Sequence, residues 1–321
     1  MKRAGEFSLI DFFLSHFPRP RVPVGPGDDC AVLAPSRGAQ CITTDAVVED
    51  VHFTRAWFSP EDIGHKALAV NLSDLASMGA RPRWFVCALA LPRDYPRPAL
   101  GGIARGMSAL ARTHGIALVG GNFTSARELS ITITAAGELP RGTAPLTRAG
   151  GRPGDVLYVS GTLGEARLGL SLLQAGRRRA PAILRQKRPE PRVALGRLAS
   201  RYASAALDLS DGLAQDLGHL CAASRVGAEL DLEALPLTPA VRAALGPEGA
   251  LAGGEDYELL MAVPPERTSV FERACLRAEE AVTRVGRLTP DAMGRIRTGR
   301  GRAPRLPAGF DHFRRGRQGA D

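Results

Sequence analysis

Carboxylates interrupt apolar segments of this 321-residue chain at points where a strand or helix would otherwise continue. A carboxylate is seldom buried without a partner, because its removal from water is costly. The acidic positions are Asp28 and Asp29 in GDDCAVL, Asp45 in ITTDAVV, Asp74 in NLSDLASMG, Asp208 and Asp211 in ALDLSDGL, and Glu255 and Asp256 in LAGGEDYELL. Each alone has a structural explanation, such as a helix cap at Asp211, a solvent-facing side chain at Asp74 or a turn at Asp28. Their recurrence in both halves of the chain points instead to shared chemistry.

Together, these acids and their neighbouring hydroxyl groups favour a magnesium site. Hard oxygen ligands without clustered His or Cys are typical of magnesium rather than of a transition metal. Magnesium usually accompanies phosphate, and several carboxylates would hold two or more ions that neutralise a polyphosphate. The pattern therefore predicts phosphoryl transfer, in which positioning and charge stabilisation supply most of the catalysis.

The commonest phosphate-binding motifs are absent from the sequence. The chain lacks the G-x-x-x-x-G-K-[ST] loop and the protein-kinase Gly-rich loop with its VAIK and HRD partners. Metal ions and Gly-rich turns would then have to hold the phosphates of a nucleotide. The turns GGN at 120–122 and SGTLGE at 160–165 are candidates, although each is weak as an isolated motif.

Alternating strands and helices must position the acids of the first half. Apolar runs predict strands at 30–35, 41–48, 84–92, 116–121 and 129–139. Between them, apolar spacing predicts helices at about 60–79 and 98–114, each with one buried face. A stretch rich in Pro, Gly and Arg at 140–155 indicates an interdomain connection.

The second half mixes the same types of element. Its predicted strands lie at 155–161, 206–212, 228–232, 257–263 and 283–288. Helices are expected after the SGTLGE turn, from about residue 192, through Cys221 and before the last strand. Both halves therefore fit an α/β or mixed α+β class, and each places aspartates at strand ends before helices.

Composition limits the class and location of the protein. No apolar run reaches the roughly 20 residues that span a bilayer, and the N-terminus lacks a small-residue cleavage site, so we expect a cytoplasmic protein without membrane contact. Five scattered cysteines without a C-x-x-C pair suggest neither a zinc site nor disulfides. The formal charge is +9, and arginine clusters at 177–179, at 185–188 and in the C-terminal tail suit solvated loops or an anionic small molecule. No nucleic-acid-binding signature accompanies them, so we expect no nucleic-acid partner; an RNA-associated protein is an alternative that rests on these clusters alone.

Several segments, in order along nearly the whole chain, resemble the thiamine-monophosphate kinase family. They are GEFSLI, GDDCAVL, TTDAVVEDVHF, KALAVNLSDLASMGA, the GG turn after IALV, LTRAGGRPGDVLYVSGTLG, LDLSDGL, GGEDYELL and GFDHF. The resemblance implies a two-domain aminoimidazole ribonucleotide synthetase-like fold of the α/β (α+β mixed) class. An N-terminal mixed-sheet domain over 1–145 would bind ATP and magnesium and form a homodimer. A C-terminal α/β domain over 146–321 would complete the nucleotide and substrate site.

The resemblance also implies a reaction and a set of site residues. The family transfers the γ-phosphate of ATP directly onto thiamine monophosphate, which gives thiamine diphosphate. The implied metal ligands are Asp29, Thr43, Thr44, Asp45, Asp74, Asn122, Asp208 and Asp211. The implied ATP contacts are Arg105, Gly121, Asn122, Arg148 and Ser210, and the implied substrate contacts are His52, Glu255 and Phe310. No side chain is assigned to proton transfer, because the acceptor phosphate is already ionised at neutral pH and in-line positioning suffices.

Three positions depart from the family pattern. The family usually has aspartate at Asn122, and asparagine keeps a carbonyl oxygen but loses the charge. Asn122 either still ligates weakly, or hydrogen-bonds the nucleotide with one ion fewer, or marks a chain that only binds nucleotide; the first two are favoured because the other acidic positions are present. Arg105 stands where the family often has a nucleotide-contacting tyrosine. Phe310 replaces Tyr or Trp and keeps an aromatic face for the cationic thiazolium ring.

Besides the RNA-associated protein, two other functions remain open from the sequence. The first is another ATP-using member of the superfamily, such as aminoimidazole ribonucleotide synthetase or selenophosphate synthetase. Selenophosphate synthetase would need a reactive Cys near a Gly-rich N-terminal segment, and Cys30 after GDD does not fit that pattern. The other function is a non-catalytic nucleotide sensor, which rests on Asn122 alone.

Overall fold

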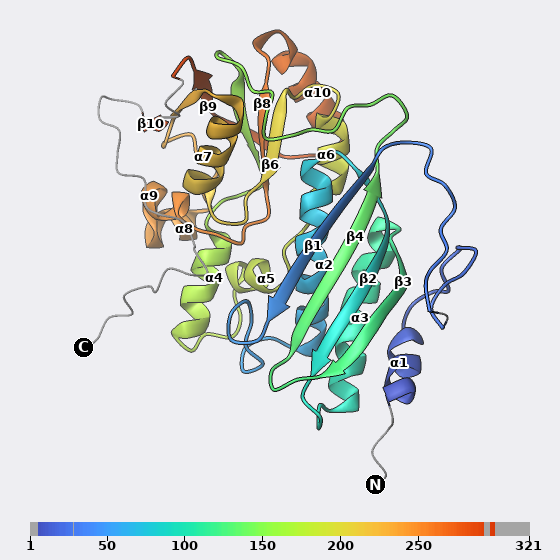
Figure 1. Ribbon diagram of the computed structural model, residues 1–321. Helices are drawn as coiled ribbons and strands as arrows, with labels where there is room; N and C mark the ends of the chain where they lie inside the picture. Colours follow the sequence, from blue (N-terminus) through green and yellow to red (C-terminus); the bar gives the residue numbers. More distant parts are fainter. Residues whose placement is uncertain (1–5, 28, 292–295, 299–321) are drawn as a thin grey trace.

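The computed structural model describes residues 6–27, 29–291 and 296–298, and their strands form two separate sheets (Figure 1). The first sheet has the order β1-β4-β2-β3. Its strands are β1 (Gln40–Val48), β2 (Arg81–Leu91), β3 (Ala117–Ser125) and β4 (Ser130–Glu138). Only β2 and β3 run parallel within it, because α3 (Arg97–His114) crosses between them, and the other neighbours are antiparallel.

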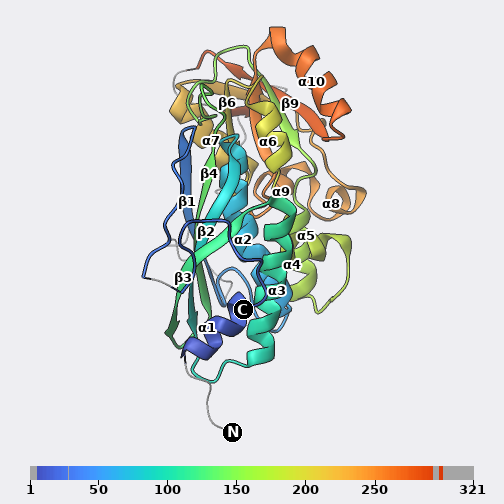
Figure 2. The same cartoon turned by 90° about the vertical axis from the view of Figure 1, so that its right-hand side faces the viewer.

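One face of the first sheet is covered and the other is bare. The helices α2 (Pro60–Ser77) and α3 lie on the same side, while no described helix covers the opposite side (Figure 2). The short α1 (Glu6–Leu14) packs beside α3, and its Phe13 meets Phe123 of β3 edge to face. The bare face therefore presents strand side chains directly to the surroundings.

The second sheet is mixed and has the order β10-β7-β9-β5-β8-β6. Its strands are β5 (Val156–Ser160), β6 (Ala205–Asp208), β7 (Gly227–Leu230), β8 (Leu259–Val263), β9 (Val282–Thr289) and β10 (Ile296–Thr298). The helices of this half are α4 (Glu165–Gln174), α5 (Pro181–Lys187), α6 (Val193–Ala199), α7 (Leu213–Ser224), α8 (Pro239–Ala244), α9 (Gly246–Leu251) and α10 (Thr268–Arg277), with a short 3-10 turn η1 (Pro265–Arg267). None of the described helices is long and apolar enough to cross a membrane.

The helix α2 joins the two halves. Ser59 and Asp62 cap its start reciprocally, since each side chain accepts the backbone N–H of the other residue. Along its length α2 contacts β1, β4 and α3 of the first half and α5, α6 and β6 of the second. The expectation of one buried face on this helix was wrong, because neighbours on nearly all sides bury most of its residues. The helix that carries Asp74 is thus the central element of the molecule.

Most predicted elements are confirmed within a few residues, but one predicted strand is wrong. Residues 30–35 form no strand; only an isolated bridge joins Val32 to Val24. Prolines at 18, 20, 23, 26 and 35 fix the backbone and remove the hydrogen-bond donors that a ladder needs. The elements α1, α5, α8, α9 and β10 were not predicted, since each is short and only weakly patterned.

Candidate active site

The cross-strand register decides which side chains of the first sheet share a face. Asp45 lies opposite Ile133, Ile133 lies opposite Cys87, and Cys87 lies opposite Gly121. Ile133 and Cys87 are buried under the helices, so this row faces α2 and α3. Asp45 therefore points from β1 toward α2, while Gly121 lies in the same row at the far edge of the sheet.

Three carboxylates meet where β1, α2 and the end of β6 come together. The side chain of Asp74 on α2 is hydrogen-bonded to Asp45 and accepts the hydroxyl of Thr43. Asp208 ends β6, is buried, and accepts the Ser73 hydroxyl at 2.7 Å. Because β1, α2 and β6 are far apart in sequence, the fold brings these acids together only through tertiary packing.

This acid cluster is held in an electrostatically unfavourable state. Desolvation raises the pKa of Asp45, and the neighbouring charge of Asp74 raises it further. Desolvation also raises the pKa of Asp208, with Asp74 again the nearest like charge. The pKa of Asp74 is raised by burial, while the hydroxyl of Thr43 and the guanidinium of Arg148 act in the opposite direction. Of the three acids Asp208 is buried, Asp74 is half-buried and Asp45 is exposed, and like charges that lie this close together call for a cation.

A second group of possible ligands adjoins the first. Oxygen or nitrogen atoms of Asp211, Asp216 and His219 lie within 4.8 Å of one another at the start of α7. The carboxylate of Asp216 accepts the backbone N–H groups of Asp211 and Gly212, each at 3.1 Å. Burial and the charge of Asp211 raise the pKa of Asp216 to about 7. The charge of the exposed Arg148 lowers the pKa of both Asp74 and Asp216, so Arg148 lies near both acid groups.

The GGED turn is bound directly to the DLSD segment. The backbone N–H of Glu255 donates to the carbonyl of Ser210 at 2.7 Å, and that of Tyr257 donates to Leu209 at 2.9 Å. Both Glu255 and Tyr257 have positive φ angles, 67° and 51°, which non-glycine residues rarely adopt. Strain of this kind is typical of functional turns that the surrounding structure holds in place.

The acid Glu255 reaches across to the first half of the molecule. Its Oε1 lies 2.7 Å from Nζ of Lys66 on α2, and its Oε2 accepts Nε2 of Gln186 on α5 at 2.6 Å. Nζ of Lys66 also donates to the carbonyl of His52 at 3.1 Å. The predicted substrate contacts His52 and Glu255 are therefore joined through one buried lysine.

The phenol of Tyr257 lies near both the Glu255 end of the site and the acid cluster. Tyr257 is buried, and desolvation raises the pKa of its phenol. The charges of Glu255 and Asp208 raise this pKa further, so Tyr257 lies near both sets of acids. The arrangement gives a site with metal-binding carboxylates at one end and a carboxylate–ammonium pair at the other.

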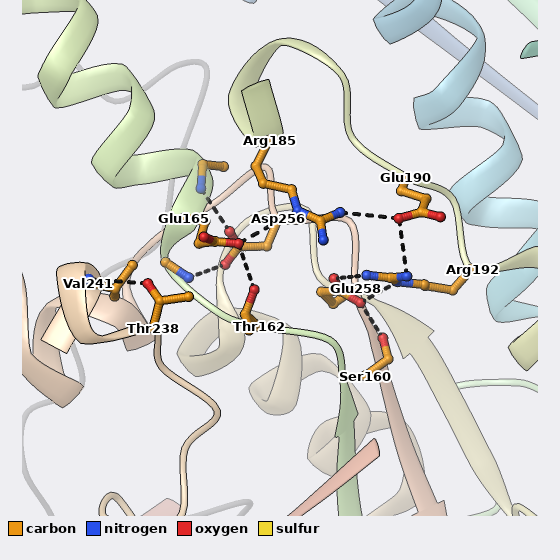
Figure 3. Close-up of polar contacts among 12 residues, drawn as sticks. Ser160, Thr162, Glu165, Arg185, Glu190, Arg192, Thr238, Val241, Asp256 and Glu258 are labelled. Carbon is orange, nitrogen blue, oxygen red and sulfur yellow. Dashed lines mark hydrogen bonds and ion pairs between the residues drawn. The ribbon is translucent and has the colours of Figure 1, made fainter. Parts of the chain in front are cut away.

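Two further acids after Glu255 stabilise the turns around the site. The carboxylate of Asp256 accepts the backbone N–H groups of Gly164 and Ala166 at the start of α4, at 2.6 and 3.1 Å (Figure 3). Glu258 is clamped by Arg192, whose Nε and Nη2 lie 2.7 and 2.6 Å from its two oxygens (Figure 3). Asp256 thus fixes the SGTLGE turn by hydrogen bonds to its backbone.

Some predicted site residues lie apart from the acid cluster within one chain. Asn122 is at the far edge of the first sheet, in the row next to Gly121, so its side chain points to the bare face. Thr44 also faces that side, where its hydroxyl donates to the carbonyl of Ile133 at 3.1 Å. Arg105 instead pairs with Glu61 at 2.6 Å, and Glu61 precedes Asp74 on α2 by about 20 Å along the helix axis.

Two predicted positions carry less structural detail. Asp29 lies in the exposed loop that precedes β1. Phe310, like Asp28, lies outside the described residues. Their roles stay predictions.

Sequence reasoning missed Lys66, Gln186, Asp216, His219 and Tyr257. Asp216 and His219 are spaced i and i+3 on α7, which is a detectable signal for one helix face. Lys66 carries a weaker signal: it is one of three lysines in the chain and lies within an otherwise apolar helical run. Gln186 lies in an arginine-rich stretch that gives no hint of a site.

Comparisons with known proteins find relatives of both halves of the chain. The sequence-family model of the AIR synthase related protein, N-terminal domain, matches residues 27–139. The family model of the C-terminal domain matches residues 152–299. Thiamine-monophosphate kinase of Escherichia coli (strain K12) is 40% identical over 323 residues, which covers 96% of this chain and 98% of that protein.

Solved structures give the same result. The crystal structure of thiamine-monophosphate kinase from Stenotrophomonas maltophilia has a TM-score of 0.82 and 39% identity, and the match covers 91% of this chain and 95% of that one. A structure of AaThiL complexed with AMPPCP and TMP has a TM-score of 0.78 and 33% identity, with 98% of both chains covered. These matches confirm the mixed two-domain fold expected from the sequence. The chain therefore belongs to the thiamine-monophosphate kinase family.

Proposed function

We propose that this protein transfers the γ-phosphate of ATP onto the phosphate of thiamine monophosphate to give thiamine diphosphate. The main support for this proposal is that Asp45, Asp74 and Asp208 lie close together. A separate carboxylate–ammonium pair, Glu255 and Lys66, lies beside them. The first group suits metal-bound phosphates, and the second suits a polar organic acceptor. The relative complexed with AMPPCP and TMP supports the same pair of substrates.

The donor set fits Mg²⁺. It consists of carboxylate and hydroxyl oxygens. Desolvation and like charges raise the pKa of Asp45 and Asp208, and a divalent cation would relieve that repulsion. The residues that would hold the ions are Asp29, Thr43, Thr44, Asp45, Asp74, Asn122, Asp208 and Asp211. Bound Mg²⁺ would neutralise the phosphate charges that otherwise repel one another during transfer. Because its side chain faces the bare side, Thr44 would serve through its main-chain oxygen.

The remaining residues would bind and orient the two substrates. Gly121, Asn122, Arg148 and Ser210 would contact the nucleotide, with Arg148 as a fixed positive charge near its phosphates. His52, Glu255 and Phe310 would contact thiamine monophosphate. No general base is required, since the attacking phosphate oxygen is already ionised, so the chain would act by holding donor and acceptor in line.

A homodimer would explain why Gly121 and Asn122 lie so far from Asp45. The two strands β1 and β3 are the open edges of the first sheet and are separated by three strand spacings, about 14 Å. A two-fold pairing of β1 with β3 of the second copy, repeated at the other edge, would bring the partner subunit's Gly121 beside Asp45 and turn the two bare faces toward each other. Residues 1–145 would thus form both the ATP and magnesium site and the dimer contact, and residues 146–321 would complete the acceptor end.

The direct test is incubation of the purified protein with ATP, Mg²⁺ and thiamine monophosphate, followed by chromatography for thiamine diphosphate. We expect stoichiometric product, which would also establish that Asn122 suffices at its position. If ATP binds and no product forms, the proposal is wrong and the chain acts as a nucleotide sensor. Restoration of turnover by Asn122→Asp would then identify the lost carboxylate as the cause.

A further inference from the structure

Lys66 is a buried cation on α2 that contacts the Glu255 carboxylate and the backbone carbonyl of His52. Its side chain is 1% exposed, although it carries an ammonium group. Nζ lies 2.7 Å from Glu255, 3.1 Å from the carbonyl of His52 and 5.4 Å from the ring centroid of Phe58. A buried ammonium is tolerated only when such partners are fixed around it. Lys66 therefore defines where the Glu255 carboxylate can lie.

Gln186 holds the other oxygen of the same carboxylate. Its Nε2 donates to Oε2 of Glu255 at 2.6 Å. An ionised carboxylate can only accept hydrogen bonds, so the amide must present its NH₂ group there and its carbonyl elsewhere. That carbonyl oxygen, Oε1, is buried and has no hydrogen-bond partner among the described residues, while the whole side chain is 3% exposed. Buried polar atoms are seldom left without a partner, which points to a donor supplied by a ligand.

The helix α5 that carries Gln186 is fixed from both halves of the molecule. Arg188, which follows α5, pairs with Asp62 of α2 at 2.6 Å, and the carbonyl of Pro189 bonds to His65 of α2 at 2.9 Å. Arg185 reaches Glu165 of α4 at 3.6 Å (Figure 3). The arginine-rich segment is thus an ordered bridge that holds the Gln186 amide in position.

We propose that Lys66 and Gln186 form the acceptor-recognition end of the site together with Glu255. Lys66 is a positioning residue that orients Glu255, and Gln186 Oε1 accepts a hydrogen bond from an N–H group of the acceptor. The ligand class is an organic cation that carries an amino group on an aromatic ring, as thiamine monophosphate does. This inference rests on the proposed function and adds the residues that select the acceptor.

Lys66→Met tests the positioning role, with Lys187→Met as its matched control. Nζ of Lys187 lies 5.6 Å from the same Phe58 ring but pairs with Asp62 rather than with Glu255. We expect Lys66→Met to raise KM for thiamine monophosphate by about tenfold or more and to leave KM for ATP within about twofold. The control should change neither constant appreciably.

A double-variant cycle separates positioning from a general loss of structure. If Lys66 acts through Glu255, the tenfold effect of Lys66→Met should disappear in a Glu255→Gln background. Equal effects in both backgrounds, or equal increases of both KM values, would overturn the positioning role.

Gln186→Leu tests the hydrogen bond to the acceptor. The probe is the analogue of thiamine monophosphate that carries oxygen in place of the ring amino group. We expect the wild type to prefer the amino substrate in kcat/KM and the variant to lose about tenfold of that preference. An unchanged preference in a folded variant would show that Oε1 does not contact the amino group. Gln186→Met serves the same purpose if the leucine variant does not fold.

The proposed function and the role of Lys66 and Gln186 can be tested separately. A wild-type protein that binds ATP but does not phosphorylate thiamine monophosphate would overturn the proposed function and this inference with it. An active wild type whose Gln186 and Lys66 variants keep normal acceptor kinetics would overturn the inference alone.

Discussion

At the residue scale, the acid cluster is costly for the fold and useful only with a cation. Asp45, Asp74 and Asp208 come from three elements, and burial raises the pKa of each. Arg148 acts on Asp74 but is itself exposed, so it offsets little of the repulsion. Folding therefore accepts an electrostatic penalty at this point, as is typical of sites that bind a charged ligand.

Asp74→Asn should separate function from stability. We expect kcat to fall by about 100-fold or more, because a charged ligand of the metal ions that would bind the phosphates is lost. The free energy of unfolding at pH 8 should stay the same or rise, since one of three crowded carboxylates is removed and the amide oxygen can still accept the Thr43 hydroxyl. Coupled kinase assays and urea unfolding measure both quantities. A variant that keeps full turnover would contradict the metal-binding role.

The sequence predicted the acids of this cluster but not their partners. Asp45, Asp74 and Asp208 stand out because each interrupts an apolar run, and that local signal survives without a structure. Lys66 gives only a weak signal and Gln186 none, since their importance comes from contacts with Glu255 that span 189 and 69 residues. Residues that act through long-range pairing cannot be distinguished from ordinary surface or core positions by spacing alone.

At the element scale, two helices cross so closely that only glycine fits at the contact. A Cβ at Gly64 of α2 would lie 2.0 Å from the carbonyl oxygen of Ile103, and one at Gly106 of α3 would lie 2.0 Å from that of Glu61. Each helix thus provides a glycine for the backbone of the other. This crossing sets the position of α2, and through it the positions of Asp74 and Lys66.

Gly64→Ala and Gly106→Ala should each destabilise the protein by about 3 kcal/mol or more, because a backbone carbonyl cannot move aside as a side chain can. Gly218→Ala on α7 is the control, since a Cβ there meets no atom within 4 Å. This control should be stabilising by about 0.5–1 kcal/mol from helix propensity. Urea unfolding of the three variants measures the effects, and a neutral result at both crossing positions would refute the proposed packing constraint.

Asp256 should give the stability of the α4 turn a measurable pH dependence. Burial raises its pKa to about 7, well above the ordinary value of 3.8. Its stabilising contribution is therefore complete below about pH 4 and is lost as pH rises to about 7, at a rate of up to about 1.4 kcal/mol per pH unit. The amide of Asp256→Asn cannot ionise. The free energy of unfolding of the wild type, relative to that of the variant, should therefore fall between about pH 4 and pH 7 and level off above about pH 7. Unfolding curves at pH 5, 6, 7 and 8 provide the test, and a difference that grows with pH would reverse the sign.

The elements themselves were predictable to different degrees. The strands around Asp45 and Asp208 were recognised because apolar runs end at clear turn signals. The helix α5 was missed because its seven residues are too few to show an amphipathic pattern, and its position depends on pairs such as Arg188 with Asp62. The burial of α2 on nearly all sides was missed because the sequence does not reveal that a second domain covers its outer face.

At the scale of the whole molecule, the bare face of the first sheet is the surface best suited to a second copy. Its outward-facing rows contain small, apolar and hydroxyl side chains, and Ile42, Ala46 and Ala88 are exposed on it. The strands β1 and β3 leave unpaired edges on either side. An uncovered sheet face with two open edges is a liability in a monomer and a natural contact in a symmetric dimer.

Ala88→Arg should break this dimer and with it the activity. Ala88 is exposed on the bare face and lies opposite Asn122, so an arginine fits the free chain but would place a charge inside a sheet–sheet contact. Sedimentation should show the wild type at twice the 34.0 kDa chain mass and the variant at the single mass. Thr113→Arg, on an exposed turn of α3, is the control and should remain dimeric. Turnover should fall as the dimer is lost, since the partner subunit's Gly121 would no longer lie beside Asp45. A monomeric variant with full activity would show instead that each chain carries a complete site.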